Sequence, residues 1–324
     1  MKSSSWLPHR LTCLAVVLGL LGVSQVAAQD ATLVEEPSKS GQIVDKAPSK
    51  IEAPFLWVIK GETPQYLLGT IHVPDARVLS LHPAIDKAME AADEIYVELA
   101  PQDQLQQLQV LRLPAGTKLS DELDEKLIAR IDQQLKKINP ALSHSALPFR
   151  IWAWPLVLPS LKAQMSDPNG VVMDMKLVKF AEDKELPVKS LEDPKTQLSG
   201  FEAFSTEDQL AFLTSTLDDM ESDEDEEDPM EKLIGIYLSG DSQALSNVFL
   251  EEFNSDELPE GLGDKLVKAL LTQRNEQMAE TILDAMKAAP EKTHLFAAGT
   301  AHYVVGPTVI DLLKKKGFEI ERVE

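Results

Sequence analysis

Residues 66–73, "YLLGTIHV", and residues 295–304, "LFAAGTAHYV", share one organisation. Each begins with a short apolar run that is typical of a buried strand and then continues into Gly-Thr-x-His. In α/β sheets, ligands bind at the carboxyl ends of the strands. We therefore expect His72 and His302 to meet at one edge of a single sheet, although they lie far apart in the sequence. The glycine of each motif, which lacks a Cβ, is expected to let the chain turn and to leave room for an ion or a substrate.

Two further predicted strands end on a carboxylate. Glu98 lies in "IYVEL" (95–99), and Glu192 follows "PVKSL" (187–191). Two imidazoles and two carboxylates together suit a divalent cation such as Mn, Co, Zn or Fe. Each side chain also has a plainer interpretation, because a histidine at a strand end often only forms a hydrogen bond and a glutamate can cap a helix. The repetition of strand-Gly-Thr-x-His favours the metal site.

The remaining pattern predicts an α/β fold with a central mixed β-sheet flanked by helices. Two apolar runs flank "GETP", residues 61–64, which indicates a β-hairpin. Helical spacing is found over residues 82–93, 120–139, 171–185, 201–289 and 306–317, and further strands are predicted over residues 94–100, 186–193 and 318–323. Since strands occur near both ends of the chain, we expect one domain, residues 54–324, with a helical insertion between the N- and C-terminal strand groups.

The first 28 residues have the pattern of a secretory signal peptide. Lys2 and Arg10 precede the apolar residues 11–23, and small residues stand before a cleavage site after Ala28. The apolar run is shorter than the ~20 residues that a transmembrane helix needs. Residues 29–53 are rich in Ser, Pro, Lys and Glu, which predicts a flexible tether. We expect a periplasmic or secreted protein without stable membrane insertion.

Charge and cysteine content exclude several classes of site. The chain has a formal net charge of −22, which repels nucleic acid. Its one cysteine, Cys13, lies in the predicted signal peptide, so the mature protein has no disulfide and no cysteine-based metal site. Residues 218–228, "DDMESDEDEED", lack the spacing of a calcium-binding loop, and we expect a solvated acidic loop or a frayed helix end there.

Five blocks of the sequence resemble successive blocks of the TraB/GumN family. They are "FLWVIKGETPQYLLGTIHV", "AADEIYVELA", "PVKSLEDPKTQLSGF", "RNEQMAETI" and "FAAGTAHYVVGPTVIDLLKKKGFEIERV". The family includes the Tiki proteases and is distantly similar to the erythromycin-esterase and ChaN-like folds. The resemblance implies an α/β fold with a central mixed sheet and a helical insertion, and metal-dependent peptidase activity with His72, His302 and Glu98 in the site. Residues of less settled role that match the family blocks are Glu192, Arg274 and Asn275.

The leading functional hypothesis is an exported, divalent-metal-dependent hydrolase that acts on a peptide or protein substrate. His72, His302 and a carboxylate, Glu98 in the family resemblance, are the predicted ligands, and Glu98 or Glu192, whichever does not bind the metal, is the predicted general base. Arg274 is predicted to stabilise the negative oxygen of the transition state. Two alternatives stay open: a non-catalytic metal or haem binder of the ChaN-like type, and a metal-free, esterase-like hydrolase with His72 as general base.

Overall fold

The central element of the fold is one six-stranded mixed sheet, as predicted. The computed structural model describes residues 50–166, 170–222, 229–254 and 258–324, so the predicted signal peptide and nearly all of the predicted tether lie outside the described residues. The strand order is β4-β3-β5-β2-β1-β6. The strands are β1 (Leu56–Ile59), β2 (Gln65–Thr70), β3 (Glu94–Val97), β4 (Val188–Ser190), β5 (His294–Gly299) and β6 (Ile320–Arg322). The sheet thus collects strands from both ends of the described chain.

Four neighbouring strands, β4, β3, β5 and β2, run parallel. β1 is antiparallel to both of its neighbours, and its pairing with β2 confirms the predicted hairpin. Every residue of β5, the strand between β3 and β2, is buried, as expected for a parallel strand covered on both faces. The parallel arrangement brings the carboxyl ends of four strands to the same edge.

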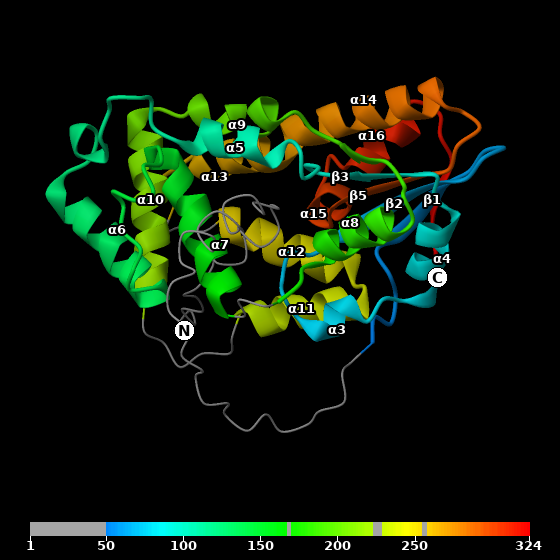
Figure 1. Cartoon of the computed structure of the whole chain (residues 1–324), viewed down its shortest axis with the longest axis horizontal. Helices are drawn as coiled ribbons and strands as arrows, with labels where there is room; N and C mark the ends of the chain where they lie inside the picture. Colours follow the sequence, from blue (N-terminus) through cyan, green and yellow to red (C-terminus); the bar gives the residue numbers. More distant parts are fainter. Residues whose placement is uncertain (1–49, 167–169, 223–228, 255–257) are drawn as a thin grey trace, which may run out of the picture.

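Helices make up most of the chain between β3 and β5, which confirms the helical insertion; β4 interrupts it (Figure 1). The α-helices are α3 (Ala76–Leu79), α4 (Pro83–Ala91), α5 (Gln104–Leu111), α6 (Glu125–Ile138), α7 (Trp154–Ser166), α8 (Met173–Asp183), α9 (Pro194–Glu202), α10 (Thr206–Glu221), α11 (Pro229–Ser239), α12 (Ser242–Phe253), α13 (Leu262–Val267), α14 (Gln273–Ala288), α15 (Ala301–Val304) and α16 (Val309–Lys315). Two 3-10 turns, η1 (Leu119–Asp121) and η2 (Ile151–Ala153), and one π-helical turn, η3 (Lys268–Thr272), complete the set. In the described part of the chain, no helix combines the length and the apolar character that a membrane crossing requires.

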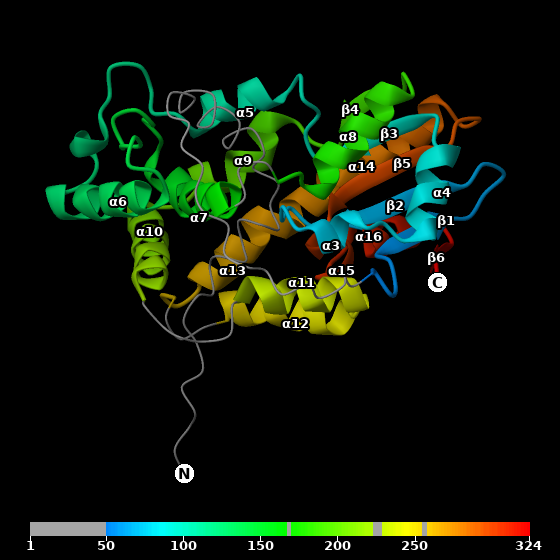
Figure 2. The ribbon, with the colours of Figure 1, turned by 60° about the horizontal axis from the view of Figure 1, so that its bottom comes forward.

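The connections place helices on both faces of the sheet (Figures 1 and 2). From β2 the chain moves through α4 to β3 and then through α8 to β4, in one direction across the sheet. It returns through α14 to β5 and through α16 towards β6, in the opposite direction. Because such crossovers are right-handed, the reversal puts α14 and α16 on the face opposite α4 and α8. The loops after β2 and β5 therefore diverge to opposite faces, and this is where α/β sheets bind ligands.

One local prediction needs correction. The predicted helix over residues 120–139 begins only at Glu125, because Asp124 caps α6 with its side chain and the preceding residues form η1. The acidic run starts inside α10, where Arg130 pairs with Asp218 and Glu221 at 2.5 and 2.8 Å. Residues 223–228 of that run lie outside the described residues.

Candidate functional site

The two Gly-Thr-x-His motifs lie side by side at the carboxyl edge of the sheet. Thr70 is paired with Gly299 in the register of β2 and β5, and the Thr300 amide donates to the Thr70 carbonyl at 2.9 Å. His72 follows β2 in a short loop, whereas His302 lies in the first turn of α15 rather than at the end of a strand. The structure therefore brings together the two histidines that the sequence separates.

Gly69 has a packing role rather than the predicted role of leaving room for an ion. A Cβ at this position would lie 2.8 Å from Thr300 Oγ1 and 3.0 Å from Phe55 Cβ. Tyr237 also donates its hydroxyl hydrogen to the Gly69 carbonyl at 2.8 Å. The glycine thus allows the two motifs to approach each other closely.

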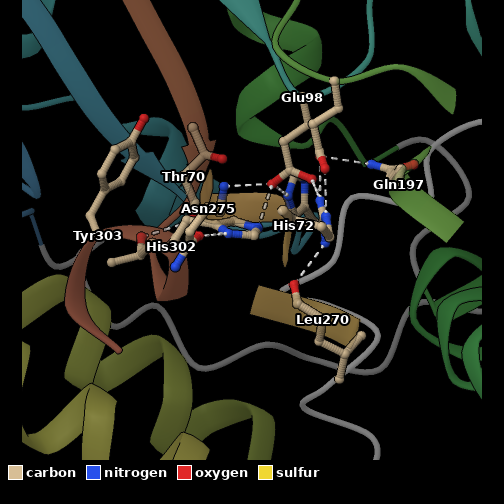
Figure 3. Close-up of polar contacts among 12 residues, drawn as sticks. Thr70, His72, Glu98, Gln197, Leu270, Asn275, His302 and Tyr303 are labelled. Carbon is tan, nitrogen blue, oxygen red and sulfur yellow. Dashed lines mark hydrogen bonds and ion pairs between the residues drawn. The ribbon is translucent and has the colours of Figure 1, made fainter. Parts of the chain in front are cut away.

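Glu98, just after β3, is the carboxylate that both imidazoles face (Figure 3). Its Oε1 accepts a hydrogen bond from the Gly299 amide at 2.6 Å, and its Oε2 accepts one from Arg274 Nη2 at 2.6 Å. Burial alone would raise the pKa of Glu98, but Arg274 and the two imidazoles outweigh it and hold this pKa well below its usual range. Glu98 is therefore a charged carboxylate at neutral pH.

The ring of His302 is oriented by Asn275 on α14. The Asn275 amide nitrogen donates to the Pro307 carbonyl at 2.8 Å, so its oxygen is the atom that faces His302 Nδ1, at 2.6 Å. Nδ1 must then carry the hydrogen, and Nε2 keeps its lone pair. This Nε2 lies 3.9 Å from Glu98 Oε1 and has no hydrogen-bond partner within the described ranges. Burial and the nearby Arg274 charge lower the pKa of His302 to about 3, so the ring is neutral.

His72 lies between two carboxylates. Its Nε2 is 3.7 Å from Glu98 Oε1, and its Nδ1 is 3.0 Å from Asp174 Oδ2. Neither contact has the alignment of a hydrogen bond, and neither ring nitrogen has another partner among the residues described. Burial by itself lowers the pKa of His72, but Asp174 and Glu98 raise it to about 10. The surroundings of His72 thus favour a positive charge, whether a proton or a cation supplies it.

Arg274 and Glu192 lie behind Glu98. Arg274 Nε and Nη2 both donate to Glu192, at 2.8 and 2.6 Å, while Nη2 also donates to Glu98 and Nη1 donates to the Leu270 carbonyl. Glu192 Oε2 accepts a further hydrogen bond from Gln197 Nε2 at 3.2 Å. Nearly all of the guanidinium donors are therefore used inside the protein, and both oxygens of Glu192 are occupied.

The helix that carries Arg274 and Asn275 begins irregularly. Residues 268–272 form the π-helical turn η3, directly before α14. Such turns are rare and occur often at functional sites, because they shift the side chains that follow. Here Arg274 and Asn275 are adjacent, yet the first contacts Glu98 and the second contacts His302.

Asp174 is absent from the sequence-based candidates, although it lies against His72. It is 2% exposed, and its Oδ1 accepts a hydrogen bond from Thr70 Oγ1 at 3.4 Å. One signal was available in the sequence: Asp174 stands three and seven residues before Leu177 and Ala181, on the buried face of α8. An acid on an apolar helix face must have a partner inside the protein.

The other described histidines have structural roles. His82 caps α4 by accepting from the Ala84 amide, His144 pairs with Asp132 at 2.8 Å, and His294 contacts Gln65 Oε1 at 2.8 Å. None of the three contacts Glu98.

The donor set around Glu98 fits a divalent cation. Two imidazole nitrogens without partners face one oxygen of a charged carboxylate, and neutral imidazole and carboxylate are ligands of Zn, Mn, Co and Fe. Within the described parts of the chain, no group of three His, Cys, Asp or Glu side chains is already spaced as a metal site. Two donor atoms that bind one ion at ~2.0–2.2 Å lie up to ~4.4 Å apart, so the separations of 3.7 and 3.9 Å do not by themselves prevent a shared ion.

A cavity adjoins these residues. It has a volume of about 290 Å³ and is lined by His72, Glu98 and Asp174 together with residues of α5 and α8. Within this lining, Glu192 and Arg274 do not occur, which agrees with their position behind Glu98.

Several known proteins are similar to this chain over most of its length. The chain is 26% identical to "Metalloprotease TIKI1" of Danio rerio, over 82% of this chain and 62% of that protein. It is 24% identical to "Metalloprotease TIKI homolog" of Nematostella vectensis, over 86% of this chain and 69% of that protein, and 25% identical to human "Metalloprotease TIKI1", over 82% and 61%. The alignment thus leaves more than a third of the Danio rerio protein unmatched. No solved structure matches the chain.

The family comparison covers nearly all of the described fold. Residues 55–322, from the start of the hairpin to the last strand, match the sequence profile of the TraB/PrgY/gumN family. The matched range includes both Gly-Thr-x-His motifs, Glu98 and the Arg274–Asn275 pair. The chain therefore belongs to the TraB/PrgY/gumN family.

Proposed function

We propose that this protein is an exported, divalent-metal-dependent peptidase whose ion is held by His72, His302 and Glu98. One observation carries the proposal: the Nε2 atoms of both histidines lack partners in the described structure and face the same Glu98 oxygen, at 3.7 and 3.9 Å. Buried imidazole nitrogens without partners are costly, and an ion between them would satisfy both. The relatives named metalloprotease support a metal-dependent protease of this family.

The bound ion would supply a water of lowered pKa and would polarise the scissile carbonyl. The protein's own residues prepare the site for it. Asn275 holds the hydrogen of His302 on Nδ1, which leaves the Nε2 lone pair of His302 available to an ion, and Asp174 lies against Nδ1 of His72, whose Nε2 faces Glu98. Arg274 holds the other oxygen of Glu98, and Glu192 holds Arg274.

The contacts also bear on the roles of Glu192 and Arg274. They do not favour Glu192 as general base, because its two oxygens accept from Arg274 and Gln197 and it does not line the cavity; Glu98, which does line the cavity, is the proposed ligand. Arg274 acts chiefly by positioning Glu98, since its donors are nearly all used inside the protein and it does not line the described cavity.

The experiment uses the mature protein, purified without a histidine tag. Metal content is measured by mass spectrometry, and turnover is measured on a library of fluorescence-quenched peptides with and without a chelator. We expect stoichiometric divalent metal and peptide cleavage that the chelator abolishes and added metal restores. Bound haem without cleavage, or cleavage that persists in chelator, would contradict the proposal.

A further inference from the structure

The cavity beside Glu98 has an apolar wall. Val97 and Leu99, which flank Glu98 in the sequence, line it together with Met175 and Val178 of α8. Exposed Lys179 and Glu182 also line the cavity, so this end reaches solvent. A peptide bound across the site would therefore place an uncharged side chain against this wall.

Gln107 of α5 is the unusual polar residue in this lining. It is fully buried, with 0% exposure, and its Nε2 donates to Gln197 Oε1 at 2.7 Å. Its Oε1 is buried and has no hydrogen-bond partner in the part of the chain that the structure describes. A buried amide oxygen without a donor is uncommon in proteins, because it loses its hydrogen bonds to water and gains none in return.

The orientation of the Gln107 amide follows from the network behind Glu98. Both oxygens of Glu192 accept hydrogen bonds from Arg274, and Oε2 accepts one from Gln197 Nε2 as well. Gln197 must then present its oxygen to Gln107, and Gln107 must donate its nitrogen in return. The oxygen of Gln107 is consequently left without a donor, and Gln107 lines the cavity.

We propose that Gln107 Oε1 is a substrate-binding acceptor that takes a backbone N–H of the bound peptide. The apolar side chain next to that N–H lies against Val97, Leu99, Met175 and Val178. This inference rests on the proposed peptidase function, and it names a determinant of how the substrate is positioned. The same residues that hold Glu98 also orient this acceptor, so substrate placement and the carboxylate are coupled through Arg274, Glu192 and Gln197.

The test removes the proposed hydrogen bond in two separate ways, by deleting the donor in the peptide and by deleting the acceptor in the protein. The tightest-binding peptide of the library is resynthesised with one backbone amide at a time replaced by an ester, which deletes a single N–H with little change in shape. The variant is Gln107→Met, and the matched control is Gln109→Met, which alters an exposed glutamine of the same helix. Dissociation constants are measured by fluorescence anisotropy on chelator-treated protein, and turnover is measured on metal-loaded protein.

We expect one ester position to weaken binding to the wild type and to Gln109→Met by about three- to tenfold. At that position Gln107→Met should bind the amide and ester peptides equally, because the acceptor is already missing. A merely structural role of Gln107 would weaken both peptides by the same factor and leave their ratio unchanged. An unchanged ratio, or undiminished binding of the amide peptide by Gln107→Met, would overturn the inference.

The same data separate this inference from the proposed function. If the wild type binds the peptide with the expected ester effect but never cleaves it, the acceptor role stands and the peptidase assignment fails. If the metal-loaded protein cleaves peptides and Gln107→Met leaves the amide-to-ester ratio intact, the peptidase assignment stands and the acceptor role fails. If the wild type neither binds nor cleaves any library peptide, both fail.

Discussion

At the scale of single residues, the two histidines differ in the charge state that their surroundings favour. Burial and Arg274 keep His302 neutral, whereas Asp174 and Glu98 favour a positive charge at His72. Both Nε2 atoms nevertheless face Glu98 Oε1. A cation bound there would replace the proton that His72 otherwise favours, and the neutral ring of His302 is ready to be a ligand.

If the two histidines hold one ion, replacing either should have nearly the full effect. We expect His72→Gln, His302→Gln and the double variant to show similarly low turnover, reduced by more than about 100-fold, because residues that act as a unit are not additive. Metal content by mass spectrometry should fall to a similar level in all three.

His294→Gln is the matched control, since His294 is buried and contacts Gln65 rather than Glu98. It should keep its metal and its turnover. Additive losses of stability with unchanged metal content in the site variants would mean that His72 and His302 are structural.

Replacing Asn275 tests whether this residue orients the ring of His302. Asn275→Ala removes the acceptor of the Nδ1 hydrogen, so we expect about 10- to 100-fold weaker metal affinity, the usual effect of losing such a partner. Competition with a fluorescent chelator measures the affinity. Asn247→Ala, an exposed asparagine on α12, is the control and should bind metal as the wild type does. Equal affinities in the two variants would rule out the orienting role.

At the scale of elements, the loops after β2 and β5 are held together by contacts that leave no room for a larger residue at Gly69. Gly69→Ala should lower the free energy of unfolding by about 1–3 kcal/mol, since its Cβ would lie 2.8 Å from Thr300 Oγ1. Gly235→Ala on α11 is the comparison, because nothing lies within 4 Å of its Cβ, and it should raise the free energy of unfolding by about 0.4–1 kcal/mol. Urea unfolding measures both, and a Gly69→Ala protein as stable as the wild type would refute the packing argument.

His294, at the amino end of β5, should make the free energy of unfolding depend on pH. Burial lowers the pKa of His294 below its usual value of 6.5, so the unfolded chain binds a proton more readily than the folded protein does. The free energy of unfolding should therefore decrease as the pH falls from 7.5 to 5.5. His294→Gln should remove this contribution, which urea unfolding at a series of pH values detects. If the free energy of unfolding varied with pH in the same way in the wild type and in His294→Gln, this pH dependence could not be assigned to His294.

At the scale of the whole molecule, one sheet joins the two ends of the described chain. β6, close to the C-terminus, pairs with β1, close to residue 50, and β5 lies between β2 and β3. The edge that carries the candidate site therefore exists only when both ends of the chain have been placed in the sheet. This supports treating residues 54–324 as a single domain, which remains a proposal.

Export also concerns the whole molecule. The positive N-terminal region and the apolar residues 11–23 predict cleavage after Ala28, so the mature protein should begin at Gln29. N-terminal mass spectrometry of the protein isolated from the exported soluble fraction should find this residue. An intact Met1 in the membrane fraction would show that the segment is retained as an anchor.

The sequence by itself was sufficient for the hairpin, the strands and several of the helices, and for most of the residues of the candidate site. Apolar runs that end in turn residues predicted the hairpin and the strands, because the side-chain pattern of a strand is a local property. Parallel strands end at one edge, so His72, Glu98, Glu192 and His302 could be expected there together. The match to the family profile confirmed the resemblance that these motifs suggested.

Only the tertiary structure decided how these residues are arranged. Asp174 and Gln107 reach the site from α8 and α5, and no local pattern tells which helix packs against which strand end. The placement of Glu192 behind Arg274, and the turn of α15 that carries His302, likewise depend on contacts between distant segments. Ring tautomers, amide orientations and pKa values are set by partners in space, and those partners come from helices more than 25 positions away along the chain.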